Sequence, residues 1–117
     1  MMAFLMGVES ISPAEVNAQR GSATVIDVNA RERWVAARVP GSVNLDHATF
    51  GPGELPPAKD ARLIFYCSNP MCRKAPIAAR RARRMGYANA VVMSAGIAGW
   101  VAAKLPVESG VRLLLEE

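Results

Sequence analysis

The sequence has only one histidine, His47, and only two cysteines, Cys67 and Cys72. This scarcity excludes a zinc site, because a structural zinc ion takes about four nitrogen or sulfur ligands. Two cysteines five positions apart in a chain with no secretory features also argue against a disulfide-stabilised scaffold. No residue pattern calls for a metal or an organic cofactor. A catalytic or redox role is left for the two cysteines.

Long hydrophobic runs are also missing. The apolar opening, residues 1–6, stops at Gly7 and has no basic region before it, so it is too short for a secretory or membrane segment. Internal repeats and low-complexity tracts are absent, and the composition is 51% hydrophobic and 21% charged, as in globular proteins. We therefore expect one soluble, cytoplasmic domain over residues 1–117, with no membrane partner.

Acidic residues are outnumbered by basic ones, 10 against 14, which gives a net charge of +4 at pH 7. Much of the excess lies in one stretch, at Arg73, Lys74, Arg80, Arg81, Arg83 and Arg84. A nucleic-acid interface is one interpretation. Basic side chains on one helix more often form a solvated face that attracts anions, so we do not expect a nucleic-acid partner.

The rest of the chain is organised around residues 63–86. Residues 63–66 are four consecutive apolar residues, typical of a short strand buried on both faces, and Cys67 follows at its carboxyl end. A polar turn of about six residues comes next. Small apolar residues then recur at helical spacing, with Pro76 near the first turn and Gly86 just past the end. The pattern predicts strand, tight loop and helix.

This arrangement favours a reactive cysteine. Loop N–H groups and the helix amino terminus converge on Cys67 and stabilise negative charge there, which lowers a thiol pKa. Arg73 and Lys74 add positive charge beside it. The alternative is a buried, inert cysteine that packs as a small hydrophobic residue.

The remaining elements alternate between strands and helices. Strands are expected at 24–28, 43–45 and 90–93, and helices at 13–20, 30–37 and 97–104, with Ser12 and Glu15 as a capping box. Residues 46–60 form a connection with one helical turn, and the tail 111–117 is expected to add a last strand or turn. Such alternation predicts an α/β fold, a mostly parallel sheet with helices on both faces. Asp27 and Cys67 then share the carboxyl edge, where ligands bind.

Several ordered motifs resemble the rhodanese-like (sulfurtransferase homology) family in its single-domain form. They are Asp27-Val28, Glu32-Arg33-Trp34, 38–45 (Arg-Val-Pro-Gly-Ser-Val-Asn-Leu), Tyr66-Cys67, 86–90 (Gly-Tyr-Ala-Asn-Ala) and 95–100 with its Trp100. The resemblance implies a five-stranded parallel sheet and a Cys67 thiolate that takes a sulfane sulfur from an anionic donor such as thiosulfate. The Cys67 persulfide then passes it to a thiol or cyanide. The implied binding residues are Ser68, Asn69, Met71, Cys72, Arg73 and Lys74, with Asp27 as a possible secondary residue.

The chain also departs from the family pattern. Asn29 replaces an arginine, Ala95 replaces a glycine, and Pro70 removes one N–H from the loop. Arg73 lies six positions after Cys67, the spacing of rhodanese-fold phosphatases and arsenate reductases, in which the arginine grips a tetrahedral oxyanion. Against those activities, the loop has no carboxylate to act as general acid, and Tyr66 precedes the cysteine where those phosphatases have histidine.

Several alternatives stay open beside the sulfurtransferase. If Cys72 reaches Cys67, the pair could work as a thiol redox enzyme; the favoured alternative has Cys72 pointing into the protein. The domain could also be a non-catalytic module that binds a protein partner, or form a homodimer. His47 is favoured as a surface residue over a general base. Trp34 and Trp100 are expected to pack rather than bind substrate.

Overall fold

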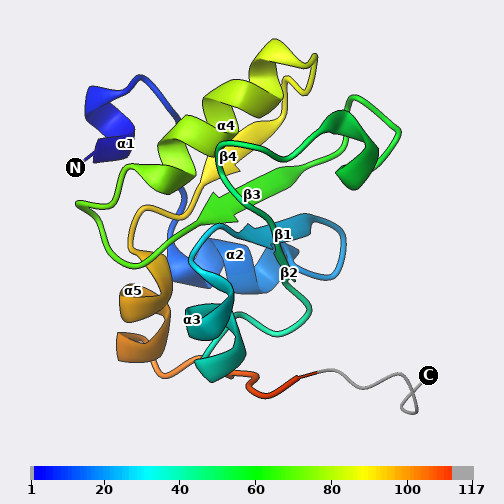
Figure 1. Ribbon diagram of the computed structural model, residues 1–117. Coiled ribbons are helices and arrows are strands. Elements are labelled where there is room, and N and C mark those ends of the chain that lie inside the picture. Colours follow the sequence, from blue (N-terminus) through cyan, green and yellow to red (C-terminus); the bar gives the residue numbers. More distant parts are fainter. Residues whose placement is uncertain (1, 112–117) are drawn as a thin grey trace.

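The computed structural model describes residues 2–111 as a parallel sheet with helices on both faces (Figure 1). The strands are β1 (Thr24–Asp27), β2 (Val43–Asn44), β3 (Leu63–Tyr66) and β4 (Ala90–Val92), in the order β2-β1-β3-β4. The helices are α1 (Met2–Leu5), α2 (Pro13–Gln19), α3 (Arg31–Ala36), α4 (Lys74–Arg84) and α5 (Gly96–Ala102). The predicted α/β class and the parallel pairing of all four strands are confirmed.

The predicted number of five strands is wrong for the described residues, which form a sheet of four. Where a fifth strand would lie beside β4, only an isolated parallel bridge joins Ser10 to Val92. The chain cannot extend this pairing beyond Ile11, because Ser12 already caps α2 and Pro13 occupies its first turn. Of the tail expected to add a strand or turn, residues 112–117 lie outside the described residues.

Alternation along β3 divides the core into two layers. Leu63 and Phe65 pack with the α4 side of the sheet, whereas Ile64 and Tyr66 pack with the side that holds Val16 of α2. Both layers exclude solvent completely at these four strand residues, as the continuous apolar run predicts. Cys67 continues the alternation and belongs to the α4 layer.

The local signals in the sequence correctly mark the helices. Ser12 Oγ accepts a hydrogen bond from the Glu15 amide, and Glu15 accepts one from the Ser12 amide, so the predicted capping box is present. The predicted helical turn in the long connection is the 3-10 helix Pro52–Glu54. The helix α4 has 11 residues, whereas a helix that spans a bilayer needs about 20. No helix within residues 2–111 is long and apolar enough to cross a membrane.

Candidate active site

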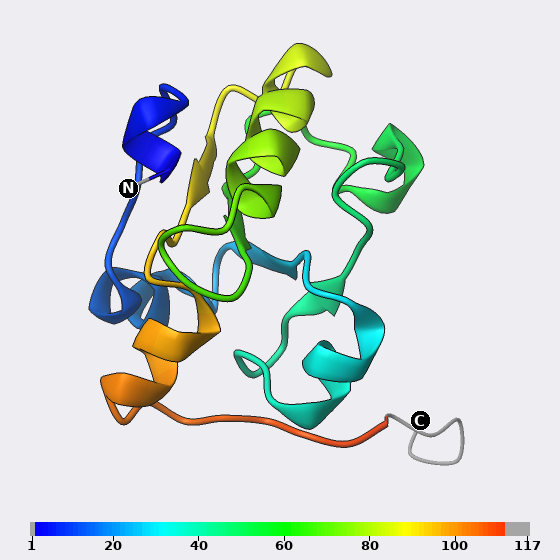
Figure 2. The same cartoon turned by 60° about the vertical axis from the view of Figure 1, so that its left-hand side comes forward.

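Cys67 follows β3 directly and is the first residue of the loop that joins β3 to α4. Its exposed fraction is 3%, and it packs against residues of the α4 layer. Figure 2 shows this loop passing between the start of α4 and the helix α5. The amides of Ile97 and Ala98 in α5 donate to the carbonyls of Cys67 and Ser68, at 2.9 and 3.0 Å. The cysteine is therefore held from both sides of the sheet edge.

Cys67 and Cys72 form a disulfide across the loop, with their Cα atoms 6.4 Å apart. The favoured expectation that Cys72 points into the protein and does not meet Cys67 is therefore wrong. Asn69 explains the tight turn, because its carbonyl accepts from the Cys72 amide at 3.1 Å and its Oδ1 accepts from the Met71 amide at 2.9 Å. Since α4 begins only at Lys74, Cys72 belongs to this turn and not to the helix.

The loop has backbone donors, but fewer than the sequence suggests. The Met71 and Cys72 amides are engaged by Asn69, and Pro70 has no N–H. Within residues 2–111 the amides of Ser68, Asn69 and Arg73 make no hydrogen bond. These three N–H groups are donors that the loop can offer to an anion or to the Cys67 sulfur.

Two residues that were not predicted as site residues contact the loop at Ser68. The Ser68 hydroxyl donates to Asn29 Oδ1 at 2.8 Å, and Arg33 Nη1 donates to Ser68 Oγ at 3.4 Å. Asn29 is 6% exposed, whereas Arg33 is exposed. A signal for Asn29 was available, because it lies two residues after Asp27 at the carboxyl edge of the sheet, where loops from neighbouring strands meet.

Asp27 supports this edge without facing the cysteine. It pairs with Tyr66 in the sheet register, so it lies on the face opposite to Cys67. Its Oδ1 accepts from the Asn29 amide at 2.8 Å, while its buried Oδ2 makes no hydrogen bond within residues 2–111. Burial raises the pKa of Asp27, and burial together with the Asp27 charge raises the pKa of Tyr66. Asp27 therefore orders the turn that carries Asn29, and it does not cap α3.

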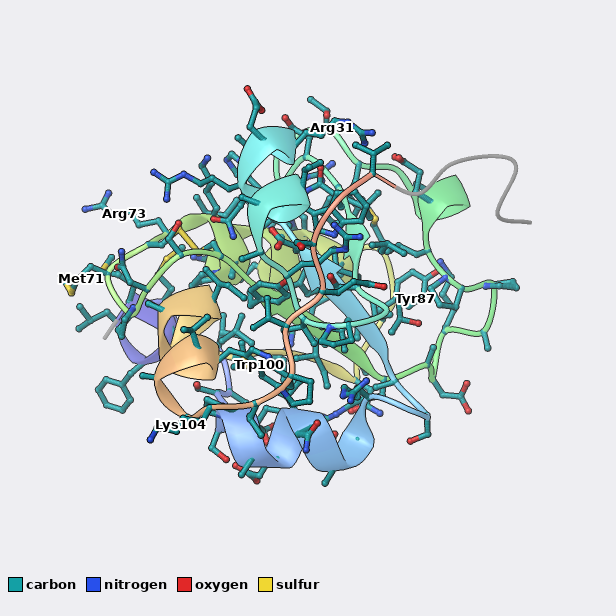
Figure 3. All side chains as sticks on the ribbon, turned by 90° about the horizontal axis from the view of Figure 1, so that it is seen from below. Arg31, Met71, Arg73, Tyr87, Trp100 and Lys104 are labelled. Atoms are coloured by element: carbon teal, nitrogen blue, oxygen red, sulfur yellow. A yellow bond between two sulfur atoms is a disulfide. The ribbon has the colours of Figure 1, made fainter. Side chains whose placement is uncertain are left out.

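The predicted charged residues of the loop lie on its outside. Met71, Arg73 and Lys74 are exposed, and Figure 3 shows Met71 and Arg73 projecting away from the body of the protein. In this arrangement Arg73 does not form the two-pronged grip on a bound oxyanion that its spacing from Cys67 suggests. It contributes positive charge at the mouth of the loop.

The weaker candidates lie elsewhere. No hydrogen bond within residues 2–111 joins the His47 ring to Cys67, and the His47 carbonyl accepts from Arg81 at 3.3 Å. Trp100 is fully buried and donates to the Pro106 carbonyl at 2.6 Å, as expected for a packing residue. Trp34 is partly buried, and its Nε1 donates to Ser42.

These features define an α/β protein with a cysteine held in a backbone loop at the carboxyl end of a central parallel strand. The family model of the rhodanese-like domain matches residues 12–103, and the chain belongs to that family.

Relatives of known sequence or structure fit this assignment. The HTH-type transcriptional regulator Rv0324 of Mycobacterium tuberculosis is 31% identical over 104 residues, a match that covers 87% of this chain and 46% of the regulator. The chain thus spans less than half of that relative. The BH2092 protein of Bacillus halodurans has a TM-score of 0.78 at 19% identity, covering 91% of this chain and 80% of its own. The human single-domain sulfurtransferase TSTD1 has a TM-score of 0.69 at 22% identity, covering 82% and 97%.

Proposed function

We propose that this protein is a sulfurtransferase that carries a sulfane sulfur as a persulfide on Cys67. The observation that carries the proposal is the position of Cys67, directly after β3 and at the start of a loop whose Ser68, Asn69 and Arg73 amides are uncommitted within residues 2–111. Such amides stabilise a thiolate and, after transfer, the terminal sulfur of a persulfide. The family and the fold shared with the human single-domain sulfurtransferase support the same activity.

The reaction has two steps. In the reduced protein, the Cys67 thiolate attacks the outer sulfur of thiosulfate, a sulfur–sulfur bond forms, and sulfite leaves with the electron pair of the broken bond. A thiolate or cyanide then attacks the outer persulfide sulfur and carries it away, which returns the Cys67 thiolate. The donor is a small anion and the acceptor a thiol or cyanide.

The cationic residues around the loop suit an anionic donor. Arg33 contacts Ser68, the residue next to Cys67, and Arg73 and Lys74 add charge at the loop mouth. We assign Arg33 the direct contact with the donor, and Arg73 and Lys74 an attraction that acts over a longer distance and weakens with salt.

A second function is favoured by the disulfide itself. If the Cys72 thiol attacks the inner sulfur of a Cys67 persulfide, the Cys67–Cys72 disulfide forms and hydrosulfide leaves. The sulfur would then be released as sulfide, and two electrons from an external thiol would be needed before the next turnover. This is the thiol redox enzyme that the sequence leaves open.

The decisive experiment is the intact mass of reduced protein after incubation with thiosulfate, for wild type, Cys67→Ser and Cys72→Ser, with and without reductant. Sulfur transfer predicts a gain of one sulfur atom that needs Cys67 and persists in Cys72→Ser. Release as sulfide predicts that wild type instead ends as the disulfide and that the gain is stable only in Cys72→Ser. No gain in any form contradicts the sulfurtransferase and favours an oxyanion enzyme or a non-catalytic module.

A further inference from the structure

We infer that the Cys67–Cys72 disulfide is reduced from one side: an external anionic thiol attacks Cys72, and Cys67 leaves as the thiolate. The inference deepens the proposed function, since this route returns Cys67 directly to the form that attacks a sulfur donor. Cys72 thereby becomes the point of entry for the reductant.

Access to the two sulfurs differs. Cys67 is 3% exposed and packed within the α4 layer, whereas Cys72 is partly exposed and lies in the loop between the exposed residues Met71 and Arg73. Thiol–disulfide exchange requires the attacking thiolate to reach one sulfur of the pair. The accessible sulfur is that of Cys72.

The stability of the departing thiolate also favours attack at Cys72. Exchange is faster when the departing thiol has the lower pKa. Within residues 2–111, the amides of Ser68 and Asn69, the two residues after Cys67, make no hydrogen bond and can meet negative charge that develops on its sulfur. The Cys72 amide already donates to the Asn69 carbonyl. Departure of Cys67 is therefore favoured over departure of Cys72.

Charge around the entry point selects the thiol. Arg73 and Lys74 follow Cys72 directly and are exposed, and Arg33 contacts the loop at Ser68. An incoming thiolate that carries further negative charge is attracted to this surface more strongly than a thiolate whose charge is offset by an ammonium group.

The electrons and atoms balance over two exchanges. The first thiolate forms a mixed disulfide with Cys72, and the Cys67 thiolate departs with the bonding electron pair. A second thiolate then attacks the sulfur of the first, the external disulfide leaves, and Cys72 becomes a thiolate. Two external thiols are oxidised to one disulfide, and the protein gains two electrons.

The direction of attack can be measured on the wild-type protein. The protein is oxidised with diamide, treated with one equivalent of glutathione, and quenched after a short time with acid and N-ethylmaleimide. Both cysteines fall in the tryptic peptide 63–73, and its fragment ions locate each group. We expect glutathione on Cys72 and N-ethylmaleimide on Cys67. Glutathione on Cys67, or glutathione divided evenly between the two cysteines, overturns the inference. So does an intact mass that does not fall by two hydrogens after diamide treatment, because the disulfide then does not form.

The charge argument has its own control. We expect glutathione to reduce the disulfide faster than the cationic thiol cysteamine at equal thiolate concentration. This advantage should fall by about fivefold in Arg73→Gln/Lys74→Gln. It should be unchanged in Arg80→Gln, which removes an exposed charge further along α4. An advantage that is absent, or equal in all three proteins, contradicts the charge selection. None of these readouts depends on sulfur transfer, so they fail independently of the proposed function.

Discussion

Asn29 occupies the position at which the family motif has arginine, and in this protein its side chain holds the loop. Its Oδ1 accepts the Ser68 hydroxyl proton at 2.8 Å, and its carbonyl accepts from Asn44 Nδ2 at 2.9 Å. Arg33 donates to the same Ser68 oxygen. The substitution therefore does more than remove an arginine: it supplies an acceptor that an arginine cannot supply.

If the proposed function holds, replacing Asn29 with alanine should slow sulfur transfer without removing the Cys67 thiol. The change deletes a partly buried hydrogen bond worth about 1 kcal/mol, so we expect kcat/KM for thiosulfate to fall by about fivefold. Asn17→Ala is the control, because within residues 2–111 the Asn17 side chain hydrogen-bonds Arg20 alone, across one turn at the end of α2. Equal kcat/KM in Asn29→Ala and wild type would show that Ser68 does not need this contact.

Asp27 should make stability depend on pH. Burial raises its pKa above the ordinary value near 3.8, so the folded protein keeps the Asp27 proton to a higher pH than the unfolded chain does. This contribution is fully present below the unfolded pKa and is lost as the pH rises through the folded pKa. Asp27→Asn cannot titrate but retains an oxygen for the Asn29 amide. We expect the free energy of unfolding of the variant, relative to that of wild type, to be lowest at about pH 3.5 and to rise toward about pH 7, as measured by urea unfolding. A stability difference that stays constant with pH would contradict this assignment.

At the scale of elements, α5 fixes the loop as much as α4 does. Gly96 opens α5 with a φ of +68°, and a Cβ there would lie 2.5 Å from the Ser68 carbonyl carbon. The close approach lets Ile97 and Ala98 reach the Cys67 and Ser68 carbonyls. A glycine is needed at this point because backbone here packs against backbone.

Gly96→Ala should therefore displace the loop. Gly7→Ala is the matched control, since Gly7 has a φ of +71° and a Cβ at that residue would meet no atom within 4 Å. Both variants pay the cost of left-handed backbone, about 1–2 kcal/mol, but only Gly96→Ala also forces Ser68 away. We expect Gly96→Ala alone to reduce sulfur transfer by more than about tenfold when folded protein is compared by near-UV circular dichroism. Equal losses in the two variants would mean that the contact with Ser68 is unimportant.

At the scale of the whole molecule, the segment after α5 contacts the end of α3 and the residues that follow it. It crosses beneath the sheet from α5 toward α3 (Figure 1). Arg38, buried between them, pairs with Glu108 at 3.1 Å and donates to the Trp34 and Gly110 carbonyls. Its guanidinium also lies 4.1 Å from the centre of the Trp34 ring. One buried cation thus joins α3 to residues about 70 positions later in the chain.

Arg38→Met should loosen this connection. Loss of a buried, multiply bonded guanidinium costs about 2–4 kcal/mol, so we expect the urea midpoint to fall and Trp34 fluorescence to change. Arg80→Met, at an exposed arginine on α4, serves as the control and should shift the midpoint little. If both variants unfold at the same urea concentration, the buried contacts of Arg38 do not contribute to stability.

The sequence by itself determined the class of fold, the central strand and the position of Cys67 directly after that strand. Residues 63–66 are apolar throughout, and helix signals follow at Pro76 and Gly86, so short-range patterns were sufficient. The prediction of five strands was wrong because Ser12 and Pro13 start α2 and so end the extended segment after one bridge. The start of a helix here prevents the preceding residues from forming a longer strand.

Only the tertiary structure decided which residues meet Cys67. The disulfide depends on the turn that Asn69 tightens, and the Asn29–Ser68 contact joins residues 39 positions apart. Asp27 and Cys67 share the edge of the sheet, as predicted, but point to opposite faces. Spacing along a chain fixes which residues lie at an edge, whereas side-chain direction and loop closure depend on contacts between distant segments.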